Sequence, residues 1–182
     1  LIWVMVFALF SINYILIYLS ETHLGSGIVA VLFGTQPFFV FFFGYLFAGE
    51  RSSAATWLGA ALALAGVAVI SLVGEQQGSW IFALAAVASA AVSAVGMAYA
   101  KRKARFDPLA TLPISMLIAG AATLVLGIAF EHPALASALA PASLASLLYL
   151  ALLGSAVAFF LNLWLLKRIS VAAVGLTSLV TP

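Results

Sequence analysis

The residues best able to do chemistry in this chain are uncharged polar side chains within long apolar stretches. They supply hydroxyls, amides and phenols: Ser11, Asn13, Tyr14, Tyr18, Gln36, Tyr45, Ser89, Ser93, Ser115, Ser155 and Asn162. No Asp, Glu, Lys, Arg or His lies well inside these stretches. A proton relay or fixed counter-ion at membrane depth normally needs one of those ionisable residues. The pattern therefore predicts a site that holds its ligand with hydroxyls, amides, aromatic faces and backbone groups.

Residue types that bind metals or form catalytic groups are sparse and far apart. The chain has no cysteine, which excludes thiolate metal sites and disulfides. His23 and His132 lie in different turns without acidic partners at metal-ligand spacing. The segment Gly25-Ser26-Gly27 has neither the lysine nor the preceding strand of a phosphate-binding loop. We expect no catalytic residues, no metal and no cofactor.

The composition identifies the solvent that surrounds these residues. Of 182 residues, 66% are hydrophobic and 7% are charged, and the mean hydropathy is +1.26. A soluble domain carries roughly a quarter charged residues, so the outer surface must face lipid. Membrane β-barrels alternate apolar and polar residues over about ten positions, whereas these runs are continuous and rich in Ala and Leu. The expected fold is all-α, a polytopic bundle of transmembrane helices.

The charged residues divide the chain into spans. A helix needs about 20 apolar residues to cross the hydrocarbon. About seven spans meet this expectation, with the last one truncated: residues 1–20, 24–49, 53–74, 78–100, 108–130, 143–166 and 170–182. The residues before 143, which include Pro133 and Pro141, are expected to form a loop.

The basic residues predict an orientation. All seven Lys and Arg residues lie in the second, fourth and sixth connections, at Arg51, Lys101–Arg105 and Lys167–Arg168. The other connections contain no Lys or Arg, and their ionisable residues are Glu and His. Short loops rich in Lys and Arg stay in the cytoplasm, so we expect these loops inside and the first span to run outward. We interpret the basic cluster as a topological anchor, not as a nucleic-acid site.

Glu50 stands at the end of the second span, next to Arg51. One interpretation makes it part of a gate or an ion-coupling site. The interpretation we favour is a structural ion pair with Arg51 in an interfacial loop.

A weak repeat relates two distant segments. Residues 23–37 and 168–182 align without a gap, each with a polar turn, small residues and a late proline, Pro37 or Pro182. Arg168 lies 145 residues after His23, and five predicted spans lie between the two positions. An odd number of spans inverts the unit, as in many secondary transporters. Each proline should kink its helix, either facing a central path or only shaping the packing.

An ordered set of motifs resembles a known family. Leu24 through Gly25-Ser26-Gly27 to Pro37, then Gly49-Glu50-Arg51, Gly59 and Gly66-Val67, is similar to the EamA domain of the drug/metabolite transporter superfamily. Residues 169–182 resemble the same pattern beginning again. The resemblance implies ten helices in two five-helix repeats, of which this chain would hold helices three to eight and the start of nine. Residues 1–74 would end the first repeat and residues 78–182 would begin the second.

The resemblance also implies a function, which we combine with the polar residues. We expect a secondary transporter in the bacterial inner membrane that exports or exchanges amino acids, related metabolites or amphipathic compounds. The expected substrate-binding residues are Asn13, Tyr14, Tyr18, Gln36, Pro37, Ser89, Ser93, Asn162, Trp164 and Ser178. Expected partners are a small-molecule substrate and the lipid bilayer but no nucleic acid, and a homodimer is left open. The alternative is a membrane-embedded enzyme or a structural membrane subunit without transport.

Overall fold

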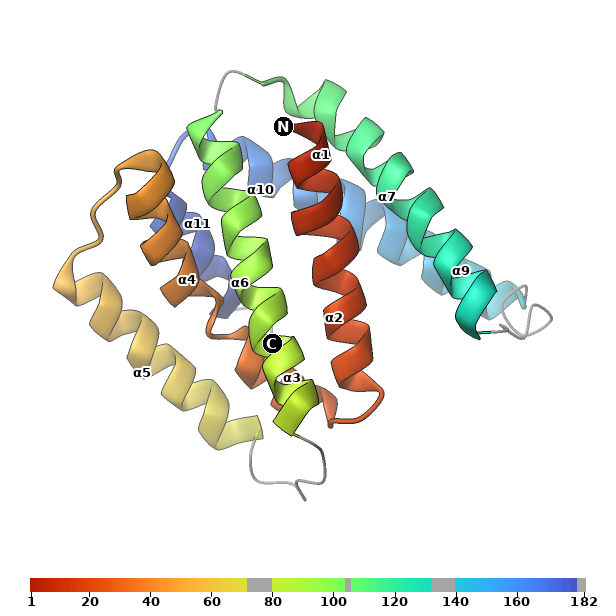
Figure 1. Ribbon diagram of the computed structural model, residues 1–182, viewed down its shortest axis with the longest axis horizontal. Coiled ribbons are helices and arrows are strands. Elements are labelled where there is room, and N and C mark those ends of the chain that lie inside the picture. Colours follow the sequence, from red (N-terminus) through yellow and green to blue (C-terminus); the bar gives the residue numbers. More distant parts are fainter. Residues whose placement is uncertain (72–79, 104–105, 132–139, 180–182) are drawn as a thin grey trace.

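The computed structural model describes residues 1–71, 80–103, 106–131 and 140–179, and all regular structure in these ranges is helical. Figure 1 shows the helices side by side, with α6 near the centre of the bundle. Five helices are long and apolar enough to cross a membrane: Ile2–Glu21, Ser26–Ala48, Trp80–Arg102, Pro108–Phe130 and Pro141–Leu166. The prediction of a polytopic helical bundle is confirmed.

Several of these spans combine two or more helical segments. The first contains α1 (Ile2–Val4), the π-helical η1 (Met5–Ser11) and α2 (Ile12–Glu21), and the second contains α3 (Ser26–Phe33), α4 (Gln36–Phe43) and η2 (Gly44–Ala48). Next come α5 (Ala54–Ser71), α6 (Trp80–Arg102) and α7 (Pro108–Glu131). The last segments are α9 (Pro141–Tyr149), η3 (Leu150–Val157), α10 (Ala158–Leu166), α11 (Val171–Gly175) and η4 (Leu176–Leu179).

The expected spans agree with these helices to within a few residues. The third span was predicted to reach residue 74, but residues 72–74 lie outside the described part of the chain. The sixth begins at Pro141, two residues before its predicted start, because proline is well tolerated in the first turn of a helix. Pro182, predicted to kink the last span, lies outside the described residues.

Pro37 interrupts its span more strongly than the expected kink. Helix α3 ends at Phe33, and α4 begins at Gln36 after a turn at Gly34 and Thr35. Proline has no N–H to donate to the carbonyl of Phe33. Instead, Thr35 Oγ1 and the Thr35 N–H both donate to the Leu32 carbonyl, at 2.6 and 3.2 Å. The span is therefore two helices in series, and the second begins with Gln36.

The described basic residues gather at one end of the bundle, which we call the basic end. The Lys101 ammonium, at the end of α6, donates to the Leu166 carbonyl at the end of α10. Lys167 Nζ donates to the carbonyl of Phe106, just before α7. At the opposite end, Ser20 Oγ donates to the Phe82 carbonyl and joins the end of α2 to the start of α6. Helices α2 and α10 therefore run in opposite directions.

The predicted repeat has matching helix boundaries. The π-helical stretches begin at Met5 and Leu150, and the helices that follow them end at Glu21 and Leu166. Gly25 and Ser170 then precede α3 and α11 with nearly the same extended backbone, φ −60°, ψ 139° and φ −63°, ψ 151°. Each of these pairs is separated by the same interval as His23 and Arg168 in the sequence alignment.

The main apolar core lies toward the basic end. It contains side chains from the starts of the first and fifth spans and from the late parts of the second, fourth and sixth, including Met5, Val40, Ala100, Leu112 and Leu166. The small residues Ala86, Ala90, Ala94 and Ala98 of α6 are completely buried. Small side chains let neighbouring helices approach closely in a membrane, which explains why α6 can sit centrally.

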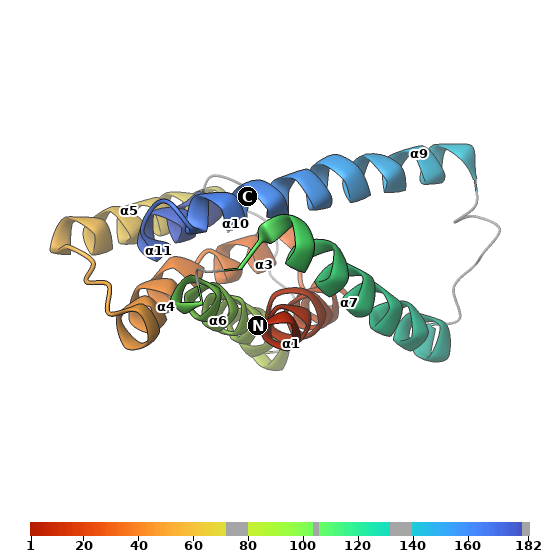
Figure 2. The ribbon, with the colours of Figure 1, turned by 90° about the horizontal axis from the view of Figure 1, so that it is seen from above.

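Away from the basic end the bundle opens. Helix α7 and the continuous α9–η3–α10 helix diverge from one another (Figure 2). In an 18-residue apolar stretch of α7, 17% of the residues are buried in the protein, and in such a stretch of the α9–η3–α10 helix the share is 0%. Because their side chains are mostly Leu, Ile, Val and Phe, these faces must meet lipid or further protein.

Candidate functional site

A cavity of about 350 Å³ lies between the first span, the helix break of the second span, α6, α10 and α11. We call it the central cavity, and it is lined by Leu9, Phe10, Asn13, Tyr14, Ile17, Phe33, Gln36, Ser93, Met97, Phe159, Asn162, Leu163, Val174 and Thr177. Its volume is at the small end of the range for ligand pockets. Its lining combines apolar walls with a few converging polar groups, which is typical of small-molecule sites.

The helix break aims an amide into this cavity. Gln36 is the first residue of α4 and is buried, with 5% of its surface exposed. Its Nε2 donates to Ser93 Oγ at 2.7 Å and lies 3.7 Å from Met97 Sδ, both on α6. A buried amide needs such partners because its desolvation is otherwise uncompensated. The break and α6 are therefore joined by a polar contact at the cavity wall.

Asn13, on α2, also lines the central cavity. Its Nδ2 donates to the Leu9 carbonyl at 3.3 Å, a weak bond within its own span. That bond turns Oδ1 away from Leu9, and Oδ1 is buried without a hydrogen-bond partner within the described structure. Leaving such an acceptor unpaired costs about 1–3 kcal/mol. The cavity wall thus holds a polar group whose hydrogen-bonding capacity is unused.

Aromatic rings separate the central cavity from a second hollow of about 600 Å³ between α2, α7 and η3–α10, which we call the lateral hollow. Phe10, Tyr14 and Phe159 line both spaces. The Phe10 and Phe159 rings meet edge to face, with centroids 4.9 Å apart, and the Tyr14 and Phe159 centroids are 6.5 Å apart. These three rings form an aromatic partition between the two spaces.

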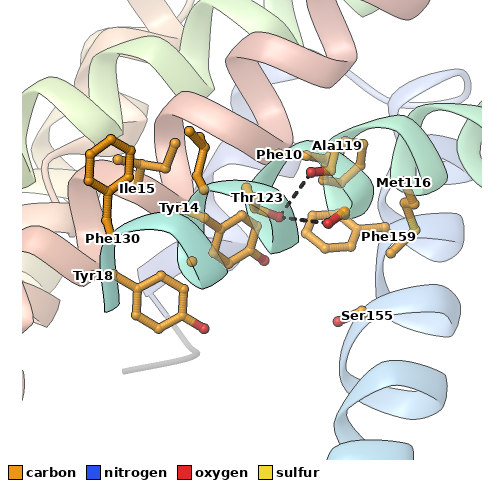
Figure 3. Close-up of a pocket in the computed structure, with 13 residues that line it drawn as sticks. Phe10, Tyr14, Ile15, Tyr18, Met116, Ala119, Thr123, Phe130, Ser155 and Phe159 are labelled. Carbon is orange, nitrogen blue, oxygen red and sulfur yellow. Dashed lines mark hydrogen bonds between the residues drawn. The ribbon is translucent and has the colours of Figure 1, made fainter. Parts of the chain in front are cut away.

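The lateral hollow has few polar groups (Figure 3). Its Thr123 hydroxyl bonds to the carbonyls of Ala119 and Gly120 within α7, at 2.9 and 3.2 Å, so it is already satisfied. The hollow is larger than the central cavity, yet it lacks the converging amides. We therefore take the central cavity as the candidate site.

Five of the ten predicted site residues line the central cavity: Asn13, Tyr14, Gln36, Ser93 and Asn162. They come from four different spans, and the structure brings them together. Asn13, Gln36 and Ser93 are buried, while Tyr14 and Asn162 are half-buried.

The other five predicted residues are placed differently. Pro37 is fully buried beside the break, and Ser89 is buried with its hydroxyl bonded to the Ala86 carbonyl of its own helix. Tyr18 is 64% exposed and lines only the lateral hollow. Trp164 stacks under the Arg168 guanidinium, whose Cζ lies 3.7 Å from the ring centroid. Ser178 lies in η4, and its side chain is outside the described part of the structure.

Sequence reasoning missed the apolar lining, including Phe10, Phe33 and Leu163. Their residue types are the same as those of side chains that face lipid, so composition cannot separate the two groups. Helical spacing from Asn13 would have found Phe10, which lies three residues earlier in the same span. It could not have found Phe33, because the helix breaks between Phe33 and Gln36.

The favoured pairing of Glu50 with Arg51 is wrong. Glu50 Oε1 lies 3.7 Å from Lys101 Nζ, and Glu50 Oε2 accepts the backbone N–H of Val171 at 2.7 Å. Gly49 makes this geometry accessible because its φ of +68° is left-handed and turns the chain sharply after η2. Glu50 therefore joins the second span to the start of α11.

Lys101 completes this set of contacts. Its ammonium also donates to the carbonyls of Leu166 and Ile169, at 2.8 and 2.7 Å, so it combines two hydrogen bonds with the ion pair to Glu50. A cation at the end of α10 and an anion at the start of α11 both complement the exposed peptide groups there. We call Glu50, Lys101 and the α10–α11 turn (residues 166–171) the basic-end clasp.

No cluster of three His, Cys, Asp or Glu side chains suitable for a metal ion occurs among the described residues. Charged groups are also missing from the residues that line the central cavity. Within the described chain, the site offers amides, hydroxyls, a thioether and aromatic faces.

Comparison with known proteins decides the family. The model of the EamA-like transporter family matches residues 1–72 and 79–182. The chain belongs to the EamA-like transporter family. Its predicted membership of the drug/metabolite transporter superfamily is thereby confirmed.

Proteins named as inner membrane transporters occur among the curated proteins similar to this chain. It is 28% identical over 163 residues to a protein named uncharacterized inner membrane transporter YedA in Escherichia coli (strain K12), and equally to those of Escherichia coli O6:H1 and O157:H7. The matched region covers 86% of this chain and 51% of each relative. The chain thus spans about half the length of the curated relatives it matches. No solved structure matches it significantly.

Proposed function

We propose that the protein is a secondary transporter of the bacterial inner membrane that carries small amphipathic metabolites, such as amino acids or related amines, by alternating access. The observation that carries this proposal is the central cavity, where polar groups of four spans converge. Family membership and the inner-membrane name of the curated relatives support the location.

The cavity lining favours a substrate with a polar head and an apolar body. Phe10, Tyr14, Phe33 and Phe159 present rings, and Asn13, Gln36, Ser93 and Asn162 present polar groups. Aromatic faces attract ammonium groups, whereas an isolated anion would meet no cationic side chain from this lining. We therefore infer a preference for amines and zwitterions over multiply charged anions.

An inverted repeat supports the mechanism. The boundaries of η1, α2 and α3 recur at the same interval in η3, α10 and α11, and α2 and α10 run in opposite directions. Inverted repeats with a site at their interface allow one half to rock against the other. Asn13 and Gln36 lie in the proposed first repeat, and Ser93 and Asn162 lie in the proposed second.

Flux through liposomes tests the proposal. The full-length protein would be reconstituted and screened with radiolabelled leucine, phenylalanine, phenethylamine and citrate. We expect saturable flux for at least one of the first three and none for citrate. Leu substitution of Asn162 should lower that flux at least tenfold, whereas Ser146→Leu on the exposed face of α9 should leave it unchanged.

The same measurements separate the alternatives. Unchanged flux in Asn162→Leu, Asn13→Leu and Gln36→Leu would assign these amides a packing role only. Absence of saturable flux for every compound would favour a structural membrane subunit or an enzyme over a transporter.

A further inference from the structure

We propose that the basic-end clasp is a closed gate, so that Glu50 must separate from Lys101 and Val171 before the central cavity can open toward the basic end. This inference rests on the proposed function and identifies the contacts that close the central cavity on the side of the basic end. Glu50 lies in the first half of the chain, whereas Lys101 and the α10–α11 turn lie in the second.

The clasp joins segments that would move relative to one another. Glu50 follows the second span, whereas Val171 starts α11, and 121 residues separate them. Lys101 bonds to the turn 65 and 68 residues further along the chain. The Lys101 bonds hold the α10–α11 turn against the end of α6 within the second half. The contacts of Glu50 with Lys101 and Val171 cross between the two halves, so rocking of the halves must break them.

Tightly packed apolar residues lie between the clasp and the cavity. Val40 on α4 and Val171 and Val174 on α11 have no exposed surface. A Cβ added to Gly175 would lie only 2.8 Å from Val40 Cγ1, so α4 and α11 are in direct contact. Among the described residues, this α4–α11 contact therefore lies between the central cavity and the basic end.

At the opposite end, Ser20 Oγ donates to the Phe82 carbonyl, but no ion pair joins the two halves there among the described residues. Helices α7 and α9 diverge there (Figure 2), and Tyr18 and Phe130, beside the lateral hollow, are 64% and 79% exposed. Charge-assisted bonds are found at the closed end, where Glu50 and Lys101 side chains keep 25% and 18% exposure. Partial exposure leaves water able to replace these bonds when the gate opens, which is what a reversible contact requires.

A disulfide provides a direct test because the native chain has no cysteine. A Cβ on Gly44 would lie 3.7 Å from Val171 Cβ, close to the mean separation of about 3.8 Å in disulfides. The double variant Gly44→Cys/Val171→Cys should therefore crosslink η2 to α11 on oxidation. We expect oxidation to lower flux at least tenfold and reductant to restore it, with each single variant as the matched control.

Two results from the crosslink would overturn the gate. Undiminished flux in the crosslinked protein would show that η2 and α11 need not separate during transport. Failure of the two cysteines to join under oxidation would show that the resting contact is absent. Flux would be followed with whichever radiolabelled compound of the screen gives the highest wild-type rate.

A second measurement needs no transport and therefore separates this inference from the proposed function. A reporter cysteine at Asn162 would be exposed to a membrane-impermeant maleimide from the basic end. We expect Lys101→Met and Glu50→Gln to raise its labelling rate at least several-fold, and Lys103→Met, an exposed neighbour on the same helix end, to leave it unchanged. Equal rates in all three variants would refute the gate even if the protein carries no compound tested.

Discussion

Gln36 Nε2 and Ser93 Oγ lie 2.7 Å apart at the wall of the central cavity, although 57 residues separate them. The bond joins the first residue after a helix break to the middle of the most buried helix. It fixes the direction of an amide in a cavity that Asn13, Asn162 and several aromatic rings also line.

Removing one partner of this hydrogen bond should lower the stability of the protein. We expect Gln36→Leu and Ser93→Ala each to lower the free energy of unfolding by about 1–3 kcal/mol. The first removes the donor to the buried Ser93 hydroxyl, and the second leaves Gln36 Nε2 with the Met97 thioether, a weak acceptor. The double variant should lose less than the sum of the two. Denaturant unfolding in detergent micelles measures all three, and strict additivity would contradict a direct bond.

Substitution of Asn13, unlike that of Gln36 or Ser93, should not lower the free energy of unfolding. Its Oδ1 is buried without a partner in the described structure, so Asn13→Leu should keep or raise the unfolding free energy while flux falls about tenfold. A rotation of the side chain would let Oδ1 reach a ligand donor. Ser11→Ala is the matched control, since Ser11 Oγ is also buried and unpaired but does not line the cavity. A loss of stability in Asn13→Leu would instead indicate a structural amide.

Close packing between α4 and α11 depends on Gly175. A Cβ there would meet Val40 at 2.8 Å, so we expect Gly175→Ala to lower the unfolding free energy by about 1–3 kcal/mol through overpacking. Val40→Ala should recover part of that loss by removing the two γ carbons. Gly59→Ala on α5, where an added Cβ meets nothing within 4 Å, should keep or slightly raise stability. Equal effects at the two glycines would contradict the contact.

The orientation can be tested by labelling single cysteines in intact cells. Thr22→Cys lies in the exposed turn after α2, and Ser53→Cys lies in an exposed position at the basic end. Because loops rich in Lys and Arg stay in the cytoplasm, an impermeant maleimide should label residue 22 directly and residue 53 only after permeabilisation. The reverse pattern would place the basic end outside.

Much of the architecture follows from the sequence because the membrane constrains it. Apolar length fixes where spans such as Trp80–Arg102 occur, since backbone polar groups in lipid must be satisfied within a helix. The same reasoning places Asn13 and Gln36 toward the protein interior, because exposing an amide to hydrocarbon is costly. Both residues are indeed buried and line the same cavity.

Other features depended on how the helices pack. Tyr18 has the same residue type as Tyr14, and Trp164 lies two residues after Asn162. The rotation of their helices nevertheless directs them to the lateral hollow and to Arg168. Glu50 has Arg51 beside it in sequence, but the left-handed turn at Gly49 brings it to Lys101 and Val171. Sequence determined which residues are polar, apolar or basic and how long each span is. Only the tertiary structure decided their partners, because contacts between distant segments depend on helix rotation and approach that local periodicity does not specify.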